Sequence, residues 1–298
     1  MLLVSLAGIL WGTIGPGVVL IHDRSGLAPL TISAYRALFA VAALLLFALA
    51  TKQLTRIWVA ARAQWRRVAV VGVLTAVFQM LFFVAVVVTG VSVTTVVCLG
   101  FAPVLLLVLR SAQQRRLPSV GQSFPVIVAV VGLLLVSMTG SDVQGTSPAA
   151  LGILAALGSG AAYALSAEVA SPLTRRLSTL TVTTATMSVA AAVLVPSGLV
   201  LAVARGETLT SSSTSSWLLI AFLGVVTMAL AYALLFTGLR STASGSAVVA
   251  TLLEPVTAVV IAVLFLGEIL AATGLAGSIL ILAAIASLGR QSEEPPPQ

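Results

Sequence analysis

Two charged residues lie inside long apolar stretches, Glu254 and Arg36. A carboxylate such as that of Glu254 is costly to keep ionised within a bilayer. It could carry a coupling proton or pair with a substrate amine; a protonated or hydrogen-bonded structural glutamate is the alternative. Arg36 lies roughly 9 Å from the nearer end of its stretch, at about 1.5 Å per helical residue. It could bind a substrate carboxylate, or it could extend to the headgroups or pair structurally.

Pro103 and Pro255 each lie near the middle of an apolar stretch. A proline inside a helix removes a backbone hydrogen bond and frees the carbonyl four residues earlier, here at Leu99 and Thr251. Broken helices of this kind form binding sites or hinges in membrane transporters. We therefore expect a hinge or binding role at both prolines; a kink that only helps packing is the alternative.

Aromatic and polar side chains also interrupt the apolar stretches. Trp11 lies deep in the first stretch, although Trp prefers the membrane interface, so it could form a cavity wall or simply pack tightly. Gly8 and Gly12 have the spacing of a close helix–helix contact. Isolated groups that could form hydrogen bonds in a cavity, or simply pack, are Gln79, Ser159, Tyr163 and Tyr232. Glu168, near the end of its stretch, could face water, pair with Arg175 or serve function.

Several kinds of chemistry lack their residues. The single cysteine, Cys98, excludes an intrachain disulfide and a cysteine metal cluster, and packing explains it better than reactivity. His22 is the only histidine, and no Gly-Lys-Ser/Thr phosphate loop occurs. We therefore expect no enzyme activity, no cofactor and no bound metal. A membrane-embedded enzyme and a non-transporting assembly partner remain the alternatives to transport.

Composition indicates what surrounds the chain. Of 298 residues, 59% are hydrophobic and 8% charged, and the mean hydropathy is +1.17. A soluble domain carries about 25% charged residues, so the outer surface here must face lipid. The net charge of +7 comes from basic residues in short loops. These are typical of membrane topology signals, so no nucleic-acid partner is expected.

Ten apolar stretches are long enough for membrane spans, which need about 20 residues each. They are roughly 2–21, 30–50, 67–89, 91–110, 122–139, 150–170, 180–203, 216–239, 243–266 and 271–289. Only helices satisfy the backbone in such segments, and the short alternating strands of a β-barrel are absent. The sequence predicts an all-α membrane protein with ten transmembrane helices. The first is expected to be a retained span, because no basic region precedes it.

Charge placement predicts the orientation. With the N-terminus inside, twelve Lys and Arg residues fall in cytoplasmic segments, whereas the outer loops hold only Arg24 and Arg205. This bias predicts that both termini are cytoplasmic. The proline-rich residues 291–298 are expected to form a disordered cytoplasmic tail. In the basic 51–67 connection, Trp58 and Trp65 suggest either a short helix in the inner interface or a plain basic loop.

The two halves resemble each other at a shift of 152 residues, which places Thr75–Leu105 over Thr227–Thr257 without a gap. Pro103-Val104 then falls on Pro255-Val256. We expect two five-helix repeats, residues 1–140 and 141–290. Because five is odd, the repeats insert in opposite orientations, an arrangement typical of transporters with a site near the midplane.

Short motifs complete a family resemblance. The first stretch carries Leu10-Trp11-Gly12, the fourth carries Pro103, and the ninth carries Leu253-Glu254-Pro255, followed by Leu266-Gly267-Glu268. Over nearly its whole length the chain resembles the EamA-type branch of the drug/metabolite transporter superfamily. The resemblance implies a ten-helix transporter with a cavity lined mainly by helices 1, 3, 4, 6, 8 and 9. Members typically export amino acids or related metabolites, and some import. Ala102 stands where the second half has Glu254, so any acidic function there is single.

We therefore predict a secondary transporter of small metabolites that works by alternating access in the plasma (inner) membrane. Its expected activity is export of amino acids or related compounds. The expected partners are a small-molecule substrate, the lipid bilayer and, as a candidate coupling ion, the proton. The predicted cavity residues are Trp11, Gln79, Cys98, Phe101, Ser159, Tyr163 and Tyr232, with Glu254 and Arg36 as its charges and Pro103 and Pro255 as its hinges.

Overall fold

A computed structural model describes residues 1–298 except 90, 116, 138–148, 267–271 and 292–298. Every regular element in the described residues is a helix, which confirms the predicted all-α membrane protein. The Gly267-Glu268 motif and nearly all of the predicted tail lie outside the described residues.

The helices are, in chain order, α1 (Leu2–Trp11), α2 (Ile14–Ser25), α3 (Pro29–Ala50), α4 (Leu54–Ala63), α5 (Trp65–Thr89), α6 (Val91–Gln114), α7 (Val120–Ser137), α8 (Ala149–Arg176), α9 (Thr179–Ala204), α10 (Thr214–Phe222), the π-helix η1 (Leu223–Leu230), α11 (Ala231–Gly238), α12 (Ser244–Ala250), α13 (Leu253–Leu266) and α14 (Ala272–Gln291). Local chemistry sets several of these ends. Ser178 and Ser213 cap α9 and α10 by accepting backbone N–H bonds, and Gly26 ends α2 in the left-handed conformation (φ 68°).

Eight segments of the described chain are long and apolar enough to cross a membrane. They are Leu2–Ser25, Pro29–Ala50, Trp65–Thr89, Val93–Gln114, Ala150–Arg176, Thr179–Ala204, Thr214–Gly238 and Ser244–Ile261. Two shorter apolar helical segments, Val120–Val136 and Ala272–Leu288, coincide with the fifth and tenth predicted stretches. The chain is thus a multi-pass membrane protein, and the count of ten spans stays a prediction.

Three of the spans are irregular. The first breaks at Gly12-Thr13 between α1 and α2, and there the Thr13 hydroxyl donates to the Leu10 carbonyl at 2.7 Å. The span Thr214–Gly238 contains η1, and the next one breaks at Thr251-Leu252 between α12 and α13. Broken and π-helical turns concentrate at functional sites. These three irregular turns are therefore candidates for a functional site.

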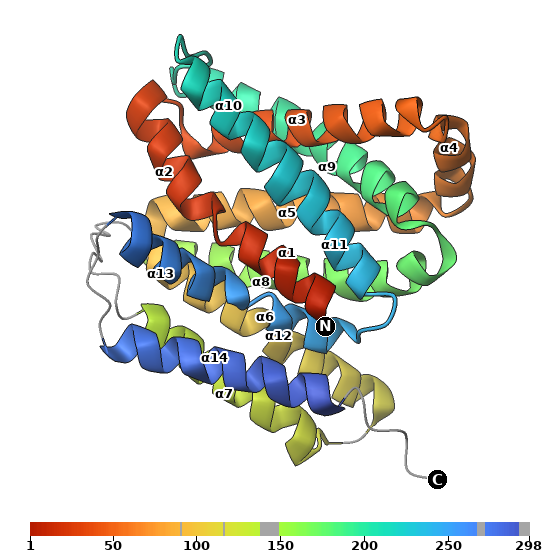
Figure 1. The fold of residues 1–298 in the computed structure, drawn as a ribbon, viewed down its shortest axis with the longest axis vertical. Coiled ribbons are helices and arrows are strands. Elements are labelled where there is room, and N and C mark those ends of the chain that lie inside the picture. The colour runs from red at the N-terminus through yellow and green to blue at the C-terminus, as the bar shows by residue number, and fades with distance from the viewer. Residues whose placement is uncertain (90, 116, 138–148, 267–271, 292–298) are drawn as a thin grey trace.

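The packing pairs helices of the first half with helices of the second (Figure 1). α5 packs on α8 and α9, while α11 and η1 make the corresponding contacts with α1 and α3. α3 lies against α9, and α7 lies beside α14 at the lower edge of Figure 1. Exchanging the two halves maps the contacts of α5 with α8 and α9 onto those of α11 and η1 with α1 and α3.

Glycines bring α1 onto the irregular turn between α12 and α13. A Cβ placed on Gly8 would lie 2.9 Å from the Thr251 carbonyl oxygen, and one on Gly12 would lie 2.6 Å from that of Glu254. The Gly8–Gly12 pair thus serves close packing, as its spacing predicts. In the other half, Gly160 of α8 packs in the same way against the backbone of Cys98 in α6.

The basic connection between α3 and α5 is helical, which favours the first of its two interpretations. Within it, α4 buries Ile57 and leaves Trp58 exposed. Trp65 at the start of α5 is also exposed, and the Arg66 guanidinium lies 5.6 Å from its ring centre. Exposed tryptophans beside arginines are typical of a helix at the membrane interface, where we expect α4 to lie.

Candidate functional site

Three predicted aromatic residues meet at the irregular turns. The Trp11 ring lies edge-to-face with Tyr232 at 5.2 Å and with Tyr163 at 6.1 Å between ring centres. Trp11 and Tyr163 are themselves 152 positions apart, the shift that relates the two halves. Phe78 extends the group beside Tyr163 at 5.2 Å. We call Trp11, Tyr163, Tyr232 and Phe78 the aromatic cluster.

Polar bonds anchor the aromatic cluster to the irregular turns. The Trp11 indole donates to the Thr227 carbonyl of η1 at 2.8 Å. The Tyr163 hydroxyl lies 2.7 Å from that of Thr251, which itself donates to the Val248 carbonyl. Because a hydroxyl has one hydrogen, Tyr163 donates to Thr251. The side chains of Trp11 and Tyr163 are therefore each bonded to an irregular turn of the second half.

Glu254 is the second residue of α13 and follows the break at Thr251-Leu252. Its backbone N–H donates to the Thr251 carbonyl at 2.9 Å, which is the carbonyl that Pro255 was predicted to free. Within the described part of the chain, its carboxylate has no hydrogen bond or ion pair, and the residue is only partly buried. Tyr163, Tyr232 and Arg36 all lie within its electrostatic range.

Arg36 and Gln79 form a second polar group, between α3 and α5. Arg36 is 5% exposed and donates from Nη2 to Oε1 of Gln79 at 2.8 Å; the Ser33 hydroxyl lies 3.5 Å from the same oxygen. The guanidinium therefore lies inside the protein and does not extend to the headgroups. This pairing brings together two residues that the sequence offered separately.

The remaining predicted residues lie around α6 and α8. Cys98 is fully buried and donates from Sγ to the Ser159 hydroxyl at 3.3 Å, and Ser159 donates to the Phe78 carbonyl at 2.8 Å. Ser159 thus touches the backbone of the aromatic cluster, and Cys98 lies in the contact between helices. Phe101 is half-buried in α6.

The two matched prolines have different surroundings. α6 continues through Pro103 without interruption, whereas Pro255 follows directly after the break between α12 and α13. Of the two predicted hinges, only Pro255 therefore lies beside a break in the helix. The break in the first span, at Gly12-Thr13, was not predicted, because neither residue type alone signals one.

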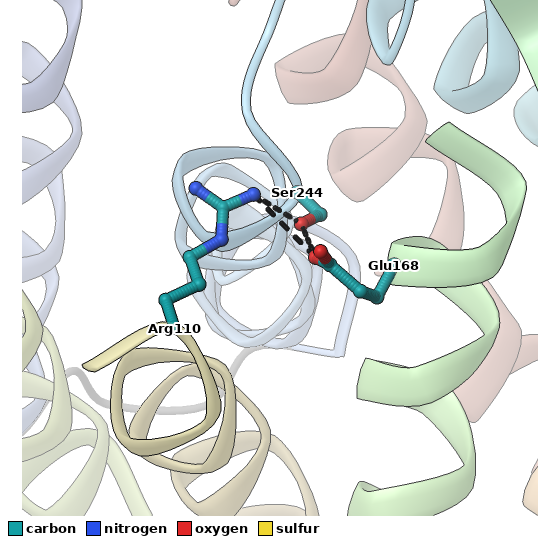
Figure 2. Close-up of polar contacts among 3 residues, drawn as sticks. All are labelled: Arg110, Glu168 and Ser244. Atoms are coloured by element: carbon teal, nitrogen blue, oxygen red, sulfur yellow. Dashed lines mark hydrogen bonds and ion pairs between the residues drawn. The ribbon is translucent and has the colours of Figure 1, made fainter. Parts of the chain in front are cut away.

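A polar network at the N-terminal side of the molecule was also missed. Arg110 of α6 donates from Nη2 to Ser244 Oγ at 2.7 Å and lies 3.4 Å from Glu168 Oε2, to which Ser244 also donates (Figure 2). The suggestion that Glu168 pairs with Arg175 is wrong, because Glu168 turns toward Arg110. Helix periodicity could not reveal a partner on another helix. We call Arg110, Glu168 and Ser244 the α6–α8–α12 network.

A cavity of about 240 Å³ borders this network. Pro103 and Arg110 of α6 line it, together with Gln122 of α7 and Ser246 of α12. Its walls mix amide, hydroxyl and guanidinium groups with apolar side chains, so polar solutes or water can occupy it. Among the described residues, no three His, Cys, Asp or Glu side chains come together as a metal site would require.

Comparison with known proteins gives concordant matches. The EamA-like transporter family matches residues 1–138 and again residues 150–290. An uncharacterised transporter of Bacillus subtilis (strain 168), YwfM, is 28% identical over 282 residues, which cover 94% of this chain and 90% of YwfM. A protein of known crystal structure superposes with a TM-score of 0.77 over 98% of both chains at 17% identity, so the likeness there is one of fold.

Proposed function

Because the chain belongs to the EamA-like transporter family, we propose that it is a secondary transporter that exports amino acids or related small metabolites by alternating access. Transport as such follows from the family. The substrate class and the mechanism are supported by the site geometry.

The observation that carries the proposal is the placement of Glu254. A carboxylate without a hydrogen-bond partner in the described residues follows a helix break and lies within electrostatic range of the aromatic cluster. Such a group suits a proton that is taken up and released during transport, or a substrate ammonium held against aromatic faces. Trp11, Tyr163 and Tyr232 would supply those faces, and Ser159 and Phe101 would extend the cavity wall.

Alternating access requires parts that can move against each other. The paired packing of the two halves supports repeats at 1–140 and 141–290 that rock around the aromatic cluster. Pro255 would act as a hinge beside the broken turn at Thr251-Leu252. Pro103, in a continuous helix, would act as a flexible point, because its ring removes one hydrogen bond from α6. Cys98 lies in the contact between α6 and α8, so the surroundings of its thiol would change during this motion.

The α6–α8–α12 network supports a closed state at the N-terminal side. It ties helices of both halves together where the Met1 ammonium also donates to Thr242, at 3.1 Å. We infer from the positive-inside bias that this is the cytoplasmic side of the plasma membrane, so the network would have to open to admit substrate from within.

The test is counterflow of the twenty amino acids in proteoliposomes, with and without a pH gradient. We expect saturable counterflow for a subset of them, and loss of any gradient dependence in Glu254→Gln. The matched control is Glu207→Gln, which changes a loop carboxylate 3.9 Å from Arg205. No flux across the panel would contradict transport of amino acids, and unchanged gradient-driven flux in Glu254→Gln would dismiss the proton role.

A further inference from the structure

Arg36 is a buried cation without an ion pair among the described residues. It lies within a span, is 5% exposed, and has one hydrogen bond, from Nη2 to an uncharged amide oxygen. Its Nε–H is buried and has no acceptor in the part of the chain that the structure describes. A buried guanidinium is normally paired or saturated with hydrogen bonds, because an uncompensated charge in a low-dielectric interior is costly. The surroundings of Arg36 are therefore incomplete.

Gln79 is incomplete in the same sense. Its Oε1 accepts from Arg36 and lies near the Ser33 hydroxyl, but its Nε2 amide group is buried without an acceptor in the described residues. The unpartnered groups of both residues are therefore N–H donors. Because the two side chains are bonded to each other, these donors are held on neighbouring groups. What this place lacks is an acceptor with several lone pairs and a negative charge, which describes a carboxylate.

The backbone around Arg36 is fixed in place. Gly224 of η1 packs so closely on α3 that a Cβ there would lie 2.6 Å from the Arg36 carbonyl oxygen. The α3 backbone at Arg36 therefore lies against η1, the π-helix to which Trp11 is also bonded. The Arg36 charge also interacts electrostatically with Tyr232 and Glu254. A small ligand that carries both an anionic and a cationic group would suit the two charges.

From these observations we propose that Arg36 and Gln79 form the carboxylate subsite of the transporter. The cargo is then a zwitterion whose carboxylate accepts from Arg36 and Gln79 while its ammonium faces Glu254 and the aromatic cluster. This inference rests on the proposed transport function and narrows its substrate to compounds with a free carboxylate. If Arg36 only linked α3 to α5 structurally, the transporter would show no preference for substrates with a carboxylate.

The first experiment compares ligands. In counterflow by the wild-type protein, the amino acid with the largest signal is competed with its own primary amide and its decarboxylated amine. All three share the side chain and the ammonium, so the difference reports on the carboxylate alone. We expect the amide and the amine to compete at least about tenfold more weakly, because they leave buried donors without an acceptor.

The second experiment supplies the missing acceptor from the protein. Gln79→Glu places a carboxylate against Arg36, so it should fill the subsite, reduce counterflow at least about tenfold and leave the Tm in detergent unchanged or higher. Gln113→Glu, at an exposed position of α6, is the matched control and should change neither quantity. As a second variant, Arg36→Lys keeps the charge but loses the planar fork, and should raise KM about tenfold with little change in kcat.

The outcomes separate this inference from the proposed function. Equal competition by amide, amine and acid would overturn the carboxylate subsite while transport stands, and so would normal counterflow by Gln79→Glu. Absence of counterflow for every amino acid would instead contradict the proposed function on which the subsite depends.

Discussion

Arg36 and Arg110 lie in the same half of the chain but have opposite surroundings. Arg110 is about one-third exposed and has a carboxylate, Glu168, and a hydroxyl, Ser244, as partners (Figure 2). Arg36 is almost fully buried, and within the described residues its one hydrogen-bond partner is the amide oxygen of Gln79. Arg110, the arginine with more protein partners, is thus also the one that is exposed enough to form hydrogen bonds with water.

This difference separates two uses of a charge in a membrane protein. The α6–α8–α12 network pairs its charges and so stabilises one arrangement of three helices. Because the network is partly solvated, breaking it costs little free energy. A buried cation short of acceptors gains most from a ligand that completes it. We therefore propose that Arg110 serves conformational control and Arg36 serves cargo binding.

The largest expected effect comes from removing the buried charge. Arg36→Met removes the charge but keeps most of the side-chain volume. We therefore expect counterflow of amino acids to fall at least about 100-fold, the loss typical of a buried charge contact. The Tm in detergent should stay the same or rise, because an incompletely paired charge is removed. Flux assays and thermal unfolding on one preparation measure both. A large fall in Tm would indicate that Arg36 instead stabilises the contact between α3 and α5.

A smaller effect is expected in the α6–α8–α12 network. Glu168→Gln keeps an acceptor for Ser244 but removes the negative charge beside Arg110. Because both side chains are about one-third exposed (36% and 32%), we expect a stability change within about 1 kcal/mol and a flux change within about fivefold. Counterflow rates and unfolding of wild type and variant provide the test. A loss as large as that of Arg36→Met would erase the distinction between the two arginines.

The smallest expected effect is a response to salt. Raising the ionic strength from about 0.1 M to about 1 M shortens the Debye length from about 10 Å to about 3 Å. The Tm difference between wild type and Glu168→Gln should therefore shrink, whereas that between wild type and Arg36→Met should not change. Thermal unfolding at both salt concentrations measures the two differences. Equal salt responses would show that the two arginines have similar solvent access.

The fold could largely be predicted because it follows from simple forces. Long apolar stretches must be helical in lipid, so composition alone predicted the helices. The irregular turns were less accessible. Pro255 signalled the break at Thr251-Leu252, yet Pro103, with the same local chemistry, lies in a continuous helix. The break at Gly12-Thr13 lies next to the bond from Trp11 to Thr227, a contact across 216 positions that no local pattern encodes.

The site was predictable residue by residue but not as an arrangement. Trp11, Tyr163, Tyr232 and Glu254 each stood out as polar or aromatic groups in apolar surroundings, and such residues need partners. Which partner each one finds depends on tertiary packing. Arg36 meets Gln79 from 43 positions away, and Glu168 meets Arg110 from 58 positions away rather than Arg175 on its own helix.

The most direct test of the cargo role of Arg36 is equilibrium binding to purified protein, since it needs no transport cycle. A radiolabelled amino acid that gives counterflow is titrated onto wild type, Arg36→Met and Arg110→Met in the same detergent. We predict that Arg36→Met loses binding by at least about 100-fold, while Arg110→Met binds within about fivefold of wild type. Undiminished binding by Arg36→Met would contradict the assignment of Arg36 to the cargo.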